Sequence, residues 1–116
     1  MFSPGPSSQV YICIEPIDVR KGIDGLAITC KYRLNKDPFS GALFVFTNKS
    51  KKSLKLLFYD GQGYWVYQKR LSEGKFNWWA TGELCQQLAV KDLNVLIWNG
   101  NPQSAQMAKD WRQIYS

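Results

Sequence analysis

The feature of this sequence that most constrains its fold is a series of four apolar and aromatic runs separated by short turn signals. The runs are ALFVFT at 42–47, LKLLFY at 54–59, YWVYQKRL at 64–71 and KFNWW at 75–79. The connections begin with Asn48, Asp60-Gly61 and Glu73-Gly74, which are residue types that favour tight turns. Strands joined this closely usually pair with their sequence neighbours, so the pattern predicts an antiparallel meander.

The connection DGQG, at residues 60–63, has two chemical interpretations. A glycine-rich loop that binds phosphate needs a strand before it and a helix after it, so that the helix N-terminus faces the anion. The segment after Gly63 has the composition of a strand instead. We therefore interpret DGQG as a hairpin turn in which Asp60 accepts bonds from backbone amides and the glycines adopt positive φ.

An amphipathic helix is predicted before the meander, over residues 18–34. Asp18 supplies an N-cap oxygen, and the helix ends before Asp37-Pro38 because the residue before proline is pushed out of the helical region. The apolar residues at helical spacing are Ile23, Leu26, Ala27, Cys30 and Leu34. A short strand is predicted ahead of the helix, from Val10, Ile12 and Ile14.

Helices are also predicted after Trp79. Thr81 can cap the first of them, and Gly100 with Pro102 ends the helical pattern. Its leucines and isoleucine are Leu84, Leu88, Leu93, Leu96 and Ile97. A last helix is predicted from the spacing of Met107, Trp111 and Ile114.

Together these elements predict a single α+β domain over residues 10–100. It combines an antiparallel meander of about four to five strands, one long N-terminal helix packed on the meander, and C-terminal helices. Residues 1–9 are expected to form a flexible arm, and residues 101–116 a C-terminal helical extension. With 116 residues, the chain can bury one core but cannot hold a catalytic domain and a separate recognition domain.

The positive charge of the chain is concentrated in its middle. The net charge is +6, and residues 18–75 alone hold 12 Lys or Arg against 5 acids, for +7. Such a segment suits a polyanion such as DNA or RNA, because binding releases counterions from the phosphates. A solubilising surface is the competing interpretation of the same charge.

Metal, disulfide and membrane features are weak in the sequence. Cys13, Cys30 and Cys85 are widely spaced, no CxxC pair exists, and the chain has no histidine. We therefore expect buried cysteines in a reducing cytoplasm, without a zinc site or another cofactor. No apolar run approaches the length of a membrane span, so we expect a cytoplasmic protein without a membrane partner.

Two or three acidic residues that met in space could hold Mg²⁺ for phosphoryl transfer. The candidates are Asp18, Asp24, Asp37, Asp60, Glu73 and Glu83. Several have a local explanation, since Asp18 caps a helix and Asp60 and Glu73 lie in turns. We therefore expect no catalytic residue and no metal ligand, and we expect the protein not to be an enzyme.

Basic and aromatic side chains are interleaved through the predicted strands. These two kinds of side chain contact phosphates and stack on bases, although many of the aromatics must instead fill the core. The predicted phosphate contacts are Arg20, Lys21, Lys51, Lys52, Lys55, Lys69 and Arg70. The aromatic residues predicted to touch a partner are Tyr64, Trp65 and Trp78.

Several ordered stretches resemble one known family. They are DVRKGIDGLA at 18–27, DPFSGALFVFTNK at 37–49, LKLLFYDGQGYW at 54–65, KRL at 69–71 and GKFNW at 74–78. In these stretches the chain closely resembles the TnpB-like accessory proteins, which the second open reading frame of bacterial insertion sequences of the sixty-six family encodes. The resemblance covers roughly residues 10–80, and the segment beyond Asn101 looks like an extension.

This resemblance implies a role in DNA transposition beside a separate transposase that carries the cutting chemistry. The leading hypothesis is a non-catalytic accessory factor whose partners are the DNA of transposon ends and the cognate transposase, with self-association as a further option. The second hypothesis is a protein interaction module that docks on the transposase or on its own copy without touching DNA. The third is a metal-dependent nuclease.

Overall fold

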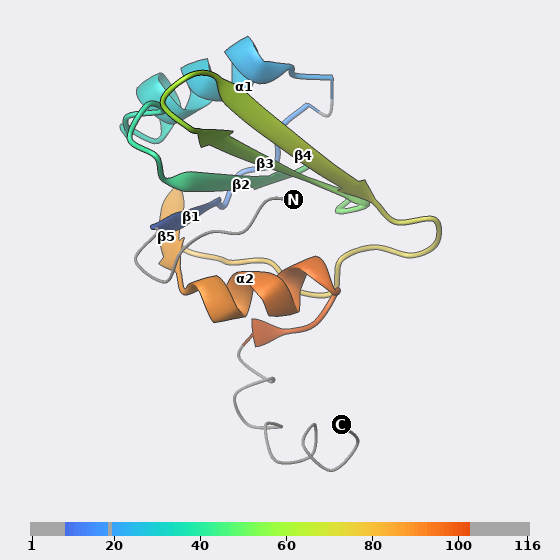
Figure 1. Cartoon of the computed structure of the whole chain (residues 1–116). Helices are drawn as coiled ribbons and strands as arrows, with labels where there is room; N and C mark the ends of the chain where they lie inside the picture. The colour runs from blue at the N-terminus through green and yellow to red at the C-terminus, as the bar shows by residue number, and fades with distance from the viewer. Residues whose placement is uncertain (1–8, 19, 103–116) are drawn as a thin grey trace.

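The computed structural model of the protein describes residues 9–18 and 20–102 (Figure 1). One five-stranded sheet has the order β4-β3-β2-β1-β5 and is accompanied by two α-helices and one π-helix. The elements in chain order are β1 (Val10–Cys13), α1 (Ile23–Ile28), η1 (Thr29–Arg33), β2 (Leu43–Thr47), β3 (Ser53–Tyr59), β4 (Tyr64–Arg70), β5 (Cys85–Leu88) and α2 (Val90–Ile97).

The meander is confirmed for β2, β3 and β4. β2 pairs antiparallel with β3, and β3 pairs with β4 over seven consecutive residue pairs, from Ser53–Arg70 to Tyr59–Tyr64. The sheet as a whole is mixed, because β1 runs parallel to β2 and antiparallel to β5. A parallel neighbour needs a long crossover, and the segment between β1 and β2, which includes α1 and η1, supplies it.

The sheet is covered on both faces, which explains why its central strands are apolar almost throughout. In Figure 1, α1 lies over one face and α2 over the other. All five residues of β2 are buried, with Phe44 and Phe46 in the cluster on the α1 side and Leu43 and Val45 in the cluster on the α2 side. A strand buried on both faces has no polar side, so continuous hydrophobicity replaces alternation.

The prediction of a fourth strand over residues 75–79 was wrong. Residues 75–79 form no strand; they cross the α2 side of the sheet as an irregular segment whose Phe76 and Trp79 are buried. The Phe76 amide donates to the Lys51 carbonyl at 2.7 Å, and Trp79 Nε1 donates to the Cys13 carbonyl at 2.9 Å. The aromatic content that resembled a strand therefore fills the core instead.

The prediction of a long N-terminal helix was also wrong, both in the length of the helix and in its N-cap residue. α1 has six residues and begins after Gly22, while Asp18 Oδ1 accepts the Arg20 amide instead of capping a helix. The helical path continues as η1, where the Leu34 amide donates to the Thr29 carbonyl five residues back. Three residues of the predicted apolar stripe, Leu26, Cys30 and Leu34, are nevertheless buried, whereas Ile23 at its start is 41% exposed.

The prediction of several C-terminal helices was wrong within the described residues. Leu88 belongs to β5, which pairs with β1, and Thr81 caps no helix. α2 is the helix that follows, and its N-cap is Ala89, without a side-chain bond. The arm expected at residues 1–9, apart from Gln9, and the helix expected from Met107 onward lie outside the described residues. Within the described part, no helix could cross a membrane.

Candidate nucleic-acid interface

The turn at residues 60–63 is a hairpin connection. The Asp60 amide donates to the Gly63 carbonyl at 3.1 Å. Gly61 has the predicted positive φ, 95°, but Gly63 does not. Asp60 Oδ1 accepts the amides of Gln62 and Gly63, while Oδ2 accepts the indole N–H of Trp65 at 2.7 Å. Both carboxylate oxygens of Asp60 thus accept hydrogen bonds from the hairpin itself, which explains why aspartate is the first residue of the turn.

These bonds lower the pKa of Asp60, with the Trp65 indole as the largest cause and the two backbone amides next. A carboxyl whose folded pKa is depressed adds stability above its unfolded pKa, and that stability is lost as the pH falls through the folded value. We expect Trp65→Phe to raise the Asp60 pKa toward its ordinary value, as measured by NMR titration. Trp98→Phe should leave it unchanged, because the Trp98 ring lies beside Lys69 and is not among the causes of the Asp60 shift.

Three of the predicted phosphate contacts lie on the α1 side of the sheet. Lys55 on β3 and Arg70 on β4 are on the same face, because Lys55 pairs with Gln68 and Arg70 with Ser53. The ammonium of Lys55 donates to the Lys21 carbonyl at 2.8 Å, which places the segment before α1 beside the sheet. Lys21 Nζ in turn donates to Thr29 Oγ1 at 3.1 Å.

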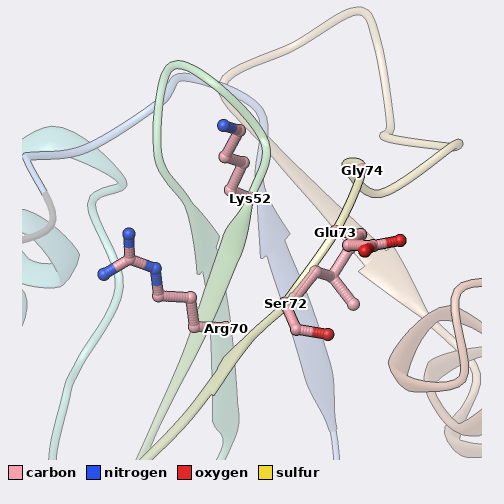
Figure 2. A pocket seen from close by; sticks show the side chains of 6 residues that line it. Lys52, Arg70, Ser72, Glu73 and Gly74 are labelled. Atoms are coloured by element: carbon pink, nitrogen blue, oxygen red, sulfur yellow. The ribbon is translucent and has the colours of Figure 1, made fainter.

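Lys51 and Lys52 lie in the β2–β3 connection at the adjoining end of the sheet. Asn48 Oδ1 holds this turn by accepting the amides of Lys52 and Ser53 at 3.0 and 3.2 Å, and Lys51 has a φ of 60°. Lys52 and Arg70 both line a hollow of about 250 Å³ with residues 71–74 (Figure 2). The Glu73 side chain points away from Arg70 in this view, so the guanidinium is left toward solvent.

Lys69 is separated from this group, although it is the neighbour of Arg70 in sequence. Its side chain is on the α2 side, where Nζ donates to the Ile97 carbonyl at 2.7 Å and lies 5.0 Å from the centre of the Trp98 ring. A cation at a helix C-terminus is favourable for the helix dipole. Lys69 therefore anchors α2, and its assignment as a phosphate contact is not supported by this position.

Arg20 is near Lys21 but is held by an acid. Its guanidinium pairs with Asp18 at 2.8 Å, and the pKa of Asp18 is lowered to about 2 chiefly by this bond. The Arg20 side chain is 86% exposed, so the pair is weak in energy. We define the basic surface as the five remaining cations, Lys21, Lys51, Lys52, Lys55 and Arg70.

The three predicted partner aromatics do not form one patch. Tyr64 is on the α1 side, where its ring contacts the rings of Phe39 and Tyr59, which also contact each other. Trp65 is on the other side, 51% exposed and stacked on Tyr67, and Trp78 is half-buried against the core. The sequence interpretation missed Trp98, which is 80% exposed; its position just after the last apolar residue of α2 was the available signal.

The acids and cysteines are the remaining residue types that could carry chemistry. Within the described ranges, no group of three Cys, Asp or Glu side chains could hold a metal ion. The three cysteines are free, and burial raises the pKa of Cys13 to about 11 and that of Cys30 to about 12. These two buried thiols are therefore protonated at neutral pH and poorly nucleophilic.

The fold and the site define a small α+β domain with a cationic surface at one end of a mixed sheet. Residues 8–107 match the family described as IS66 Orf2 like protein. Because this match covers most of the sequence, the chain belongs to that family, which confirms its resemblance to the TnpB-like accessory proteins of these insertion elements.

Two relatives in Sinorhizobium fredii (strain NBRC 101917 / NGR234) are similar to the chain. The uncharacterized protein y4hO is 37% identical over 78 residues, which is 67% of this chain and 68% of the relative. The uncharacterized protein y4jC is 33% identical over 76 residues, or 66% of this chain and 65% of the relative. The chain thus spans about two thirds of each relative, and no solved structure matches it.

Proposed function

We propose that the protein is a non-catalytic accessory factor of transposition that holds DNA by its phosphates on the basic surface. The observation that carries this proposal is the gathering of cations from four segments. Lys55 on β3 and Arg70 on β4 share one face, Lys21 of the loop before α1 is bonded to Lys55, and Lys52 of the β2–β3 turn, next to Lys51 in sequence, lines a hollow with Arg70. Membership in an insertion-element family makes transposon DNA the natural polyanion for these groups.

The geometry suits backbone contact better than sequence reading. Lys55 and Arg70 stand on a twisted sheet face, and Lys51 and Lys52 stand on a short turn. No helix in the described part presents a row of these cations for insertion into a major groove. Phosphate contacts position a protein on DNA without specifying a sequence, so the cognate transposase would supply the choice of site.

The salt dependence of binding tests the proposal. For duplex DNA, the slope of log affinity against log salt is about 0.9 per neutralised phosphate. We expect Lys52→Gln/Arg70→Gln to flatten this slope by about 1.8, measured by fluorescence anisotropy at several salt concentrations. The wild-type slope should be steep on both duplex and single-stranded DNA.

Lys91→Gln is the control for the loss of surface charge. Lys91 is exposed on α2, on the opposite side of the sheet, and its removal should leave the slope unchanged. Binding that does not depend on salt, or an equal effect of Lys91→Gln and the double change, would contradict the basic surface as the DNA contact.

A protein docking role is the second candidate, and the exposed rings of Trp65 and Trp98 favour it. Exposed aromatics are enriched where proteins bind one another. Under this alternative, Trp65→Ala or Trp98→Ala abolishes co-purification with the cognate transposase, while Lys52→Gln/Arg70→Gln leaves it intact. The opposite pattern supports DNA-mediated association. The nuclease alternative gains no support from the described acids.

A further inference from the structure

The outer side of β4 is an open sheet edge. In the order β4-β3-β2-β1-β5, β4 has β3 on one side and no strand of the described chain on the other. It spans seven residues and keeps an unbroken register with β3, so it has neither a bulge nor a proline. Proteins usually protect such edges, because the free backbone groups are a template for another strand. The opposite edge, β5, has only four residues.

The residues that offer backbone groups at this edge follow from the hydrogen bonds at the two ends of β4. The Asp60 amide bonds to the Gly63 carbonyl, and the Leu71 amide bonds to the Lys52 carbonyl. Bonded pairs alternate along an antiparallel ladder, so Trp65, Tyr67 and Lys69 direct their backbone groups to β3. Those that direct their backbone groups outward are Tyr64, Val66, Gln68 and Arg70.

We propose that this edge pairs with β4 of a second copy of the chain, antiparallel and centred on Tyr67. In this register Val66 lies opposite Gln68 of the second copy, and Tyr64 opposite Arg70 of the second copy. All four outward residues of each strand then exchange backbone bonds with their counterparts. The arrangement has two-fold symmetry and is therefore closed, as expected for a homodimer.

Charge complementarity selects this register. The cations of β4, Lys69 and Arg70, are at its C-terminal end, while the aromatics Tyr64 and Trp65 are at its N-terminal end. Antiparallel pairing about Tyr67 places each cation opposite an aromatic ring, which is a favourable contact. Parallel pairing in register would place the cations of the two copies beside each other, and an antiparallel register centred on Lys69 would oppose two lysines. Like charges directly opposite are destabilising.

The two-fold axis of such a pair is perpendicular to the sheet, so both α1 sides face the same way. The sheet becomes continuous through the two copies, and their basic surfaces lie on one side of it. The inference goes beyond the proposed function and does not depend on it, since self-association can be measured without DNA.

Sedimentation equilibrium of the full chain without DNA is the first test. We expect the mass to rise with concentration from 13.3 kDa toward twice that value. Gln68→Pro removes one outward amide in each copy while leaving the bonds to β3 in place, and should raise the dissociation constant about tenfold or more. A wild-type chain that stays at the monomer mass up to about 1 mM would overturn the proposal.

Cysteine cross-linking tests the register and does not depend on the proline variant folding. In the proposed pair Tyr67 lies opposite itself at about 4.5 Å between Cα atoms, within disulfide reach, so Tyr67→Cys should oxidise to a reducible covalent dimer. Arg70→Cys is the matched control, because the two copies of residue 70 are about 20 Å apart along the strands. Equal cross-linking of both variants, or none by Tyr67→Cys in a folded chain, would overturn this pairing.

Discussion

Phe76→Ala is expected to lower the free energy of unfolding by about 3–5 kcal/mol, the range for truncating a buried phenylalanine. Phe76 is 1% exposed and belongs to the same buried cluster as Leu54 from β3 and Leu93 from α2. Removing the ring opens a cavity between the sheet and α2, because the backbone there is tied to Lys51 and cannot collapse freely. Such a loss is a large part of the stability of a small domain.

Phe39→Ala is the matched control for this change. Phe39 is 60% exposed, and its ring contacts only Tyr59 and Tyr64 among the aromatics of the described chain. We expect its loss to cost about 1 kcal/mol, the scale of an aromatic pair at the surface. Urea denaturation followed by circular dichroism measures both changes as shifts of the midpoint. Similar midpoint shifts for the two variants would contradict the burial of Phe76 between the sheet and α2.

The meander could be predicted from the sequence because its information is local. Asp60 and Gly61 fix the β3–β4 turn within four residues, and Asn48 fixes the β2–β3 turn with its own side chain. Neighbouring strands joined by such turns pair without the help of distant residues. Bounds predicted for these three strands accordingly agree with the structure to within one residue.

The elements that were mispredicted depend on distant contacts. β5 holds two exposed glutamines, and its leucine spacing resembles a helix; its pairing with β1, more than seventy residues earlier, decides its conformation. The segment with Phe76 and Trp79 has the composition of a strand, but both side chains are buried in the core cluster between the sheet and α2, together with Leu93. Tertiary packing overrides local propensity in both cases.

The basic surface was predictable in composition but not in arrangement. Alternation along β4 indicates that Lys69 and Arg70 point to opposite faces. It does not reveal that the C-terminus of α2 lies under Lys69, or that the segment before α1 brings Lys21 to Lys55. Basic residues that are adjacent in sequence can therefore have different roles, as Lys69 stabilises α2 while Arg70 belongs to the basic surface.

Leu26→Ala is expected to have the second large effect, a loss of about 2–5 kcal/mol in the free energy of unfolding. Leu26 is fully buried in the cluster on the α1 side, together with Phe46 and Leu57. With six residues, α1 is too short to be stable by itself, so its packing on the sheet must hold it. Losing this side chain should destabilise α1 and thereby loosen the Lys21 side chain, which is bonded to Thr29 just after α1.

Ile28→Ala on the same helix is the matched control. Ile28 is 58% exposed, and alanine has the higher helix propensity, so this change should alter the free energy of unfolding by about 0.5 kcal/mol or less. Urea midpoints give the two values, and hydrogen exchange of the α1 amides reports whether the loss begins locally. If Ile28→Ala were as destabilising as Leu26→Ala, the face of α1 that packs on the sheet would have to be reassigned. The contact between Lys21 and Lys55 would then lose its structural basis.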